Sequence, residues 1–260
     1  MKNLIKTSLS VFCLFACLAV SAQPKSYTTA NVHSHNDYLN SEPFERAYRN
    51  DFGSIEADIY PVNGVLFVAH SKREVKPNLT LKGLYINPLL KKLSENKTRK
   101  LKLLIDIKEN YKQSLDLLVQ DLEPLKKYLS TPQKSGQVTI LISGTRPPPS
   151  EYKNYPDYIL FDNDQSLPHN ATEWKRVGLV SLTFQKFTAW KGVGPLDPAE
   201  QKKIKFTIDS VHHANKTIRF WAAPDTEASW LKQMELGVDL IGTDLVDELG
   251  SFLRNREKKK

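Results

Sequence analysis

Acidic side chains recur at alternate positions within two otherwise apolar segments of the sequence. One segment is "SIEADIY" at 54–60, with Glu56 and Asp58, and the other is "LKLLIDIK" at 101–108, with Asp106 and Lys108. Because side chains alternate between the two faces of a β-strand, each segment presents its polar pair on one face. Neighbouring carboxylates repel and are costly to desolvate, and a hard divalent cation relieves both problems. We predict that Glu56, Asp58 and Asp106 bind one Mg²⁺ or Ca²⁺ ion, with Lys108 holding an anionic group beside it.

A solvated strand end or an internal ion pair is the alternative for each of these segments. A single Glu-x-Asp triplet favours that alternative, since such triplets are common by chance. The occurrence of both patterns, each inside an apolar run, favours the metal site.

Histidines accompany the acidic segments. "NVHSHNDY" at 31–38 carries His33 and His35, and His70 follows the segment that contains Glu56 and Asp58. Histidine titrates near neutral pH, so two histidines can supply a general base and a general acid. We predict that His33 and His70 form this catalytic pair, although a lone histidine is more often an ordinary, partly buried one.

The other polar residues of the first histidine segment have two interpretations. His35 either shares the face of His33 or begins the loop toward a helix at 44–50. Asn36 and Asp37 either belong to the site or bond to the backbone and cap that helix. We predict that His35 and Asn36 contact the substrate in a supporting role.

Short apolar runs rich in β-forming residues alternate with longer amphipathic segments along the chain. The runs are 29–33, 54–60, 101–108, 138–143, 158–162, 178–184, 217–223 and 239–244, and the amphipathic segments include 113–128, 198–214, 228–236 and 247–254. Repeated strand–helix units of this number predict an α/β fold, the (β/α)8 TIM barrel. The alternative, a doubly wound sheet, would need a glycine-rich turn after its first strand, where this chain has "HSHNDY".

A small hairpin is predicted after the second strand. "VNGVLFVAH" at 62–70 has Asn63-Gly64 at its centre, a pair that favours a tight turn between two strands. In a TIM barrel, chemistry belongs at the C-terminal ends of the strands. The barrel would therefore bring the histidines and carboxylates to one end.

The first 22 residues resemble an export signal. Lys2 and Lys6 precede an apolar stretch at 9–20, and small residues at 20–22 suit cleavage. The stretch is short for a membrane span. We expect an exported protein, periplasmic or secreted, whose residues 23–260 form a single barrel domain with a basic C-terminal tail. A lipoprotein anchor at Cys17 is the alternative, which Phe15 disfavours.

Composition excludes several functions for the processed chain. Cys13 and Cys17 both lie in the signal, so disulfides, thiol catalysis and cysteine-bound zinc are excluded. Loss of the signal lowers the formal net charge from +8 to +6, much of it in the tail "RNREKKK" at 254–260. Such a tail is more often a solvated end than a nucleic-acid-binding arm. We expect no nucleic-acid partner, no obligate protein partner and at most peripheral membrane contact.

Four pieces of the sequence together are similar to a known family. "VHSHNDY", "FGSIEADIYPVNGVLFVAH", "LLIDIK" and "IRFWAAPD…LGVDLIGTD" occur in family order over residues 33–244. They resemble the superfamily of glycerophosphodiester phosphodiesterases and phosphatidylinositol-specific phospholipases C. The nearest pattern is a secreted bacterial branch that begins with "HxHNDY". The Glu-x-Asp pair followed by a histidine at this spacing is the specific part.

The resemblance implies a TIM-barrel phosphodiesterase with two catalytic histidines, which His33 and His70 match. It implies a metal held by Glu56, Asp58 and Asp106, and a substrate that is a small-molecule or lipid phosphodiester. Lys108 matches a lysine that contacts the phosphate, and Trp221 matches an aromatic residue at the mouth of the site.

The sequence departs from the glycerophosphodiesterase pattern at three points. His33-Ser34-His35 stands where His-Arg-Gly is usual, Ser71 stands where aspartate usually follows the second histidine, and Asp106 resembles the sphingomyelinase D branch rather than the usual glutamate. These departures leave the head group of the substrate open.

Two other functions use the same fold. His33-x-His35, with Asp244 on the last strand, resembles the metal site of amidohydrolase barrels, but those sites need histidines at the ends of the fifth and sixth strands. A non-catalytic secreted binding protein is the second alternative. Loss of Lys108 or His70 would be its signature, and both are present.

Overall fold

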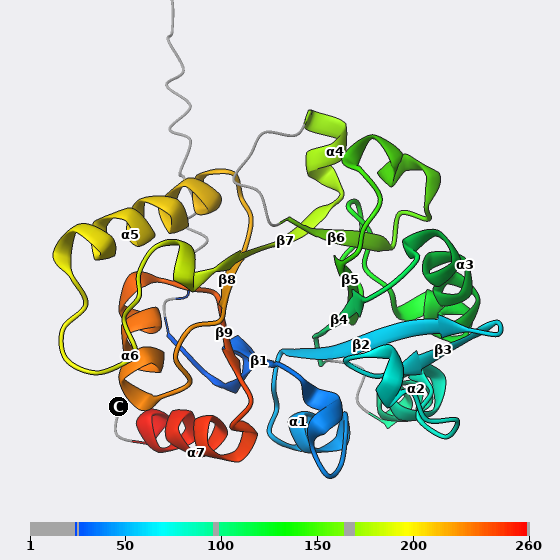
Figure 1. Ribbon diagram of the computed structural model, residues 1–260, viewed down its shortest axis with the longest axis horizontal. Helices are drawn as coiled ribbons and strands as arrows, with labels where there is room; N and C mark the ends of the chain where they lie inside the picture. Colours follow the sequence, from blue (N-terminus) through cyan, green and yellow to red (C-terminus); the bar gives the residue numbers. More distant parts are fainter. Residues whose placement is uncertain (1–23, 25, 96–98, 164–169, 259–260) are drawn as a thin grey trace, which may run out of the picture.

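The computed structural model describes residues 24, 26–95, 99–163 and 170–258. Within these residues, parallel strands close into a barrel surrounded by helices (Figure 1). The barrel strands are β1 (Val32–Ser34), β2 (Ser54–Val62), β4 (Leu101–Ile107), β5 (Val138–Gly144), β6 (Ile159–Asn163), β7 (Val177–Thr183), β8 (Ile218–Trp221) and β9 (Leu240–Thr243). Strand β1 pairs with both β2 and β9, which closes the ring. The predicted (β/α)8 barrel is confirmed.

The predicted hairpin after the second strand is present. Strand β3 (Val65–Val68) pairs antiparallel with the end of β2, so that Ile59 lies opposite Val68. Asn63 and Gly64 both have positive φ angles, of 48° and 79°. Two successive residues in this region match the turn that the Asn-Gly pair favours. In Figure 1 the hairpin extends outward from the barrel beside α2 and α3.

Helices lie outside the ring of strands. They are α1 (Glu45–Arg49), α2 (Asn87–Glu95), α3 (Tyr111–Asp121), α4 (Ala171–Lys175), α5 (Pro198–His213), α6 (Glu227–Leu236) and α7 (Val246–Glu257). The helix expected at 113–128 is shorter than predicted, because α3 ends at Asp121 and a 3-10 turn follows at Glu123–Tyr128. Pro124 in that turn has no N–H to continue an α-helical ladder.

The strand expected at 29–33 is also displaced. Thr29–Asn31 forms a 3-10 turn, in which Thr28 and Asn31 cap each other, and β1 begins only at Val32. His33 is therefore the middle residue of β1 rather than its last. This shift by one residue matters for the depth of His33 in the barrel.

The barrel interior holds an apolar layer that is separate from the core between barrel and helices. Five leucines from different strands form it: Leu104, Leu141, Leu160, Leu179 and Leu240. Two residues beyond the first four of these, on the same strand faces, lie Asp106, Ser143, Asp162 and Ser181. The inward faces of β4 to β7 thus change from leucine to polar side chains toward their C-terminal ends.

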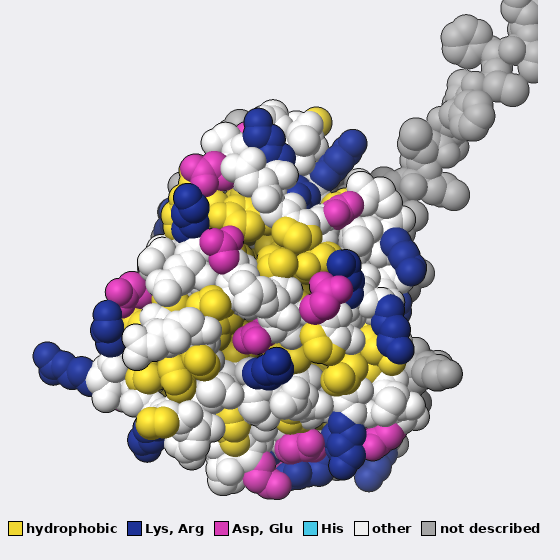
Figure 2. All heavy atoms as spheres, turned by 90° about the vertical axis from the view of Figure 1, so that its right-hand side faces the viewer, with side chains coloured by type: hydrophobic (Ala, Val, Ile, Leu, Met, Phe, Trp, Pro, Cys, Tyr) yellow, Lys and Arg dark blue, Asp and Glu magenta, His cyan; other side chains and the backbone are white. Residues whose placement is uncertain are grey.

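On the face of the molecule that carries the hairpin, positive and negative side chains are not segregated into separate patches. Basic and acidic side chains are interspersed there with apolar patches (Figure 2). No helix among the described residues is long and apolar enough to cross a membrane. The predicted signal at 1–22, with its two cysteines, lies outside the described residues.

Candidate active site

A cleft of about 410 Å³ lies at the C-terminal ends of the barrel strands. Every predicted site residue except His33 and Asp58 lines it. The lining residues are His35, Asn36, Glu56, His70, Asp106, Lys108, Ser143, Gly144, Arg146, Asp162, Ser181, Arg219 and Trp221. Residues that lie on or directly after β1, β2, β4 and β8 thus meet at this cleft.

The three predicted metal ligands lie together beside this cleft. Oxygen atoms of Glu56, Asp58 and Asp106, one from each, are within 4.8 Å of one another. Asp58 and Asp106 are paired residues of β2 and β4, so the strand register itself brings their side chains together. Glu56 and Asp58 are 4% and 1% exposed. Like charges at this distance repel one another, and a cation relieves that repulsion.

Asp58 uses its two oxygens differently. Its Oδ2 lies 2.7 Å from the Tyr38 hydroxyl, 2.9 Å from Lys108 Nζ and 3.1 Å from His70 Nδ1. Its Oδ1 is buried and has no hydrogen-bond partner among the described residues. A buried carboxylate oxygen without a donor is costly. A divalent cation held by the three carboxylates would satisfy it, so the residues present fit such an ion.

Lys108 supplies one positive charge at the cluster. Its Nζ also lies 3.2 Å from Asp106 Oδ1. Burial lowers the pKa of Lys108, but the carboxylates of Asp106 and Asp58 outweigh it and hold that pKa above its ordinary value. Burial, with the neighbouring carboxylates Asp58 and Glu56, keeps the pKa of Asp106 raised in spite of Lys108. The lysine is thus charged at neutral pH, and the cluster still favours further positive charge.

The structure corrects the expectation for the first histidine. The His33 side chain is fully buried, and both its ring nitrogens are occupied, by Ser54 Oγ at 2.7 Å and Glu56 Oε2 at 2.8 Å. Burial and the nearby charge of Arg219 lower its pKa to about 4. The ring lies inside the barrel and does not line the cleft, because β1 pairs His33 with Ser54 of β2 and with Gly242 of β9.

His35 occupies the position expected of His33. It follows β1 directly, lines the cleft and has a side chain that is 38% exposed. Its Nδ1 lies 2.8 Å from Asp244 Oδ1, at the end of β9. Burial lowers the pKa of His35, but the bond to Asp244 outweighs it, so the net pKa is raised. Of the two histidines in this segment, His35 is therefore the one that is accessible from the cleft.

His70 enters the cleft from the segment after β3. Its side chain is 63% exposed, and its Nδ1 lies 3.2 Å from the Tyr38 hydroxyl as well as near Asp58. This arrangement leaves Nε2 as the ring nitrogen away from the carboxylate. His35 and His70 thus each have one nitrogen near an acidic group that can fix the ring.

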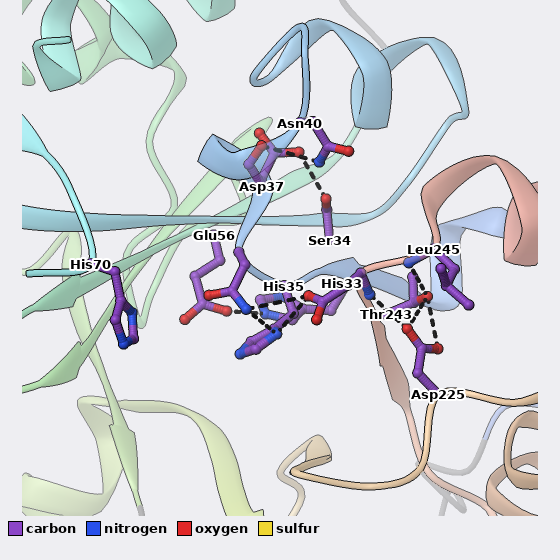
Figure 3. Close-up of polar contacts among 12 residues, drawn as sticks. His33, Ser34, His35, Asp37, Asn40, Glu56, His70, Asp225, Thr243 and Leu245 are labelled. Atoms are coloured by element: carbon purple, nitrogen blue, oxygen red, sulfur yellow. Dashed lines mark hydrogen bonds and ion pairs between the residues drawn. The ribbon is translucent and has the colours of Figure 1, made fainter. Parts of the chain in front are cut away.

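The two residues after His35, Asn36 and Asp37, lie in different surroundings. Asn36 lines the cleft and accepts a hydrogen bond from Tyr38. Asp37 is fully buried and accepts bonds from Ser34 Oγ, the Phe44 N–H and the Tyr85 hydroxyl. Figure 3 shows Asp37 directed toward Ser34 and away from Glu56 and His70. Asp37 therefore fixes the loop before α1 and takes no part in the cleft.

Sequence reasoning missed several polar residues of the cleft. Arg219 is 4% exposed, donates from Nε to Ser181 Oγ at 2.7 Å, and places Nη1 3.5 Å from Glu56 Oε2. An arginine inside the apolar run "TIRFWAA" was the available signal, since it shares a strand face with Trp221. The Leu-x-polar repeat of β4 to β7 was the signal for Ser143 and Asp162.

The described residues give no support to a histidine-rich metal site of the amidohydrolase kind. Strand β6 ends at Asp162-Asn163 and β7 ends at Thr183, without a histidine at either end. The potential metal ligands are carboxylates, as predicted for Mg²⁺ or Ca²⁺.

Comparisons with known proteins agree with this geometry. Residues 24–100 match the AIM6-like phosphodiesterase domain, and they contain His35, His70 and the Glu-x-Asp pair. Relatives named altered inheritance of mitochondria protein 6 include a homolog in Arthroderma benhamiae, 24% identical over 83% of this chain and 81% of its own. The Eremothecium gossypii protein is 26% identical over 85% of this chain and 69% of its own.

Solved structures with the same fold include two kinds of phosphodiesterase. A glycerophosphodiester phosphodiesterase from Parabacteroides distasonis has a TM-score of 0.59 at 15% identity, covering 87% of this chain and 98% of that one. A calcium-dependent phosphoinositol-specific phospholipase C from Pseudomonas has a TM-score of 0.55 at 12% identity, covering 83% and 89%. The predicted resemblance to these enzymes is confirmed at the level of fold, which is all that a structural likeness at these identities shows.

Proposed function

We propose that this protein is a metal-dependent phosphodiesterase in which His35 and His70 act as the acid–base pair. One observation carries the proposal. Three carboxylates, two of them buried and one with an oxygen that has no partner among the described residues, lie in or beside a single cleft with two accessible histidines and a charged lysine. Hydrolysis of a phosphate diester makes use of all three kinds of group.

The residues of the cleft divide the reaction between them. Hydrolysis forms a bond from an attacking oxygen to phosphorus, breaks the bond to the leaving oxygen, and moves one proton off the first and one onto the second. His35, held through Nδ1 by Asp244, presents Nε2 to one of these oxygens, and His70 presents Nε2 to the other. Water or a hydroxyl of the substrate itself is the attacking group. Lys108 holds the phosphate charge as it develops.

A cation bound by Glu56, Asp58 and Asp106 would supply Lewis-acid charge to the phosphate oxygens. The calcium dependence named for the Pseudomonas phospholipase C makes Ca²⁺ one candidate, and Mg²⁺ suits the same oxygen ligands.

The part of the cleft wall that continues from Asp106 along β5 to β8 bears on the leaving group. Ser143, Asp162 and Ser181 line it, and Trp221 is 45% exposed beside them. Hydroxyl and carboxylate groups of this kind hydrogen-bond well to hydroxyls, and an indole ring offers a flat apolar surface. A polyhydroxylated head group, such as glycerol or a sugar-like ring, fits this combination, whether its diester is soluble or lipid-linked.

A panel of phosphodiesters tests the function. We expect hydrolysis of at least one glycerol- or polyol-phosphodiester, abolition by a chelator, and recovery with Mg²⁺ or Ca²⁺. Phosphate monoesters serve as the control and should not be hydrolysed. A purified, folded chain that binds a divalent cation but hydrolyses no diester of the panel would contradict the proposal.

We also propose export, for which the sequence of residues 1–22 is the support. N-terminal sequencing of the protein recovered from its producing cells should begin at Gln23. A chain that retains its first residues in the cytoplasm would contradict it.

A further inference from the structure

His33 is a buried titratable residue that the proposed mechanism does not use. It bridges two neighbours on β2, with Nδ1 2.7 Å from Ser54 Oγ and Nε2 2.8 Å from Glu56 Oε2. His33 and Ser54 are fully buried and Glu56 is 4% exposed. Three polar side chains in such a place are costly unless each is satisfied, so their arrangement calls for a reason.

The chemistry of the partners fixes the direction of the bonds. Glu56 Oε2 lies 2.8 Å from His33 Nε2 and 3.5 Å from Arg219 Nη1, and because an arginine can only donate, Oε2 is the acceptor of this cluster. The hydrogen must then sit on His33 Nε2. In a neutral ring Nδ1 is then an acceptor, and the Ser54 hydroxyl donates to it. The bonds run in one direction, from Ser54 through His33 to Glu56.

In this arrangement the two carboxylate oxygens of Glu56 differ in their hydrogen-bond partners. Oε2 receives His33 and lies 3.5 Å from Arg219 Nη1, whereas no donor among the described residues reaches Oε1. Asp58 shows the same division, with donors on Oδ2 and none on Oδ1. Each carboxylate is therefore held by one oxygen and leaves the other for a ligand. Figure 3 shows the contact between His33 and Glu56.

We infer that His33 is a positioning residue, which holds Glu56 through Nε2–H so that its second oxygen points to the cation. The inference rests on the metal site of the proposed function. Residues that orient a metal ligand in this way commonly change metal affinity by roughly 10–100-fold when removed. His33 would thus act on the reaction without touching the substrate.

A pair of amide substitutions separates orientation of Glu56 from simple filling of space. The amide nitrogen of His33→Gln can reach the place of Nε2, and that of His33→Asn only the place of Nδ1. By calorimetric titration with Ca²⁺ or Mg²⁺, we expect His33→Asn to weaken binding about 10–100-fold. His33→Gln should restore most of the affinity. Equal affinity in the two variants would overturn the inference.

His212→Asn is the matched control. His212 is a buried histidine whose Nε2 lies 2.8 Å from Asp239 Oδ2. Asp239 immediately precedes β9, so this pair lies at the end of the barrel opposite to the cleft. Its substitution should lower stability and leave cation affinity unchanged.

A measurement on the unmodified protein covers the case in which the variants do not fold. The ¹⁵N shifts of the His33 ring should show a hydrogen on Nε2 and none on Nδ1, and the opposite tautomer would overturn the inference. A wild-type chain that binds neither cation would refute the metal in the proposed function and this inference with it. Undiminished affinity in a folded His33→Asn variant would refute only the role of His33.

Discussion

The two sides of the barrel interior are built on different principles. On β4 to β7 and β9, five leucines form an apolar layer, and the polar side chains of these strands that line the cleft lie above it. On β1, β2 and β8, polar groups extend a level deeper, as His33, Ser54, Glu56 and Arg219 bond to one another. The leucine side contributes stability through burial, which has no preferred direction. The polar side contributes orientation, because each bond fixes one atom of a carboxylate next to the cleft.

The largest effect is expected for the histidines of the cleft, which lie above the leucine layer and above the buried polar cluster. Alanine at His35 or His70 should each lower kcat by about 10²–10⁴-fold, the usual scale for general acid–base residues. Steady-state kinetics on the best substrate of the panel measures it. His213→Ala is the control, since that exposed histidine bonds only to its own helix at Asp209. If His33→Gln removes more activity than His35→Ala, the division between reacting and positioning histidines is mistaken.

The leucine layer should respond in stability and not in metal binding. Leu141 is fully buried, and Leu141→Ala should lower the free energy of unfolding by about 2–5 kcal/mol, through lost burial and the cavity left behind. Cation affinity should change less than about twofold. Denaturant unfolding and calorimetry on one preparation test both parts. A loss of cation affinity as large as that of His33→Asn would erase the contrast between the two sides.

The polar side should carry a pH dependence that the leucine side lacks. Burial first, and then Arg219, lowers the pKa of His33 to about 4, from 6.5. A lowered histidine pKa means that the folded state binds fewer protons than the unfolded state. The stabilisation is therefore complete above pH 6.5 and is lost as the pH falls toward 4. The shift corresponds to about 3 kcal/mol at most.

The free energy of unfolding, measured between pH 7 and 4 in the presence of a chelator, gives this dependence of stability on pH. The difference between wild type and His33→Gln isolates His33 from the carboxylates that titrate in the same range. Parallel stability curves for the two proteins would show that His33 does not contribute.

The smallest effect is expected at the rim. Trp221 is 45% exposed on β8 and makes no bond to the carboxylate cluster. Trp221→Ala should raise KM about threefold to tenfold with little change in kcat, since a stacking surface contributes roughly 0.5–1.5 kcal/mol. An equal fall in kcat would show that the ring also orders the reacting groups.

Most of the fold could be read from the sequence, because it depends on local patterns. The strands at 54–60, 101–108 and 138–143 lie within two residues of β2, β4 and β5, and the Asn63-Gly64 turn fixed the hairpin. The Glu-x-Asp pair was readable for the same reason, since alternation along one strand places both carboxylates on one face.

The depth of a residue along the barrel axis could not be read in this way. His33 and His35 share a strand face, so alternation alone does not say which of them reaches the cleft. The pairing register of β1 decides the question, because it sets His33 beside Ser54 of β2 and Gly242 of β9, inside the barrel. Arg219 was missed because its partner Glu56 is 163 residues away, and no local pattern links the two.

The hairpin after β2 has a consequence for how the cleft can be altered. His70 is delivered to Asp58 by the pairing of Ile59 with Val68, and the Asn63-Gly64 turn sets that pairing. One residue inserted into β3 would turn every later side chain of the strand to the other face. Two inserted residues would keep the face but shift it along the strand by roughly 7 Å. The number of residues between the Asn63-Gly64 turn and His70 therefore sets the distance from His70 to the carboxylates. Libraries that vary this number would sample different spacings between His70 and the carboxylate cluster.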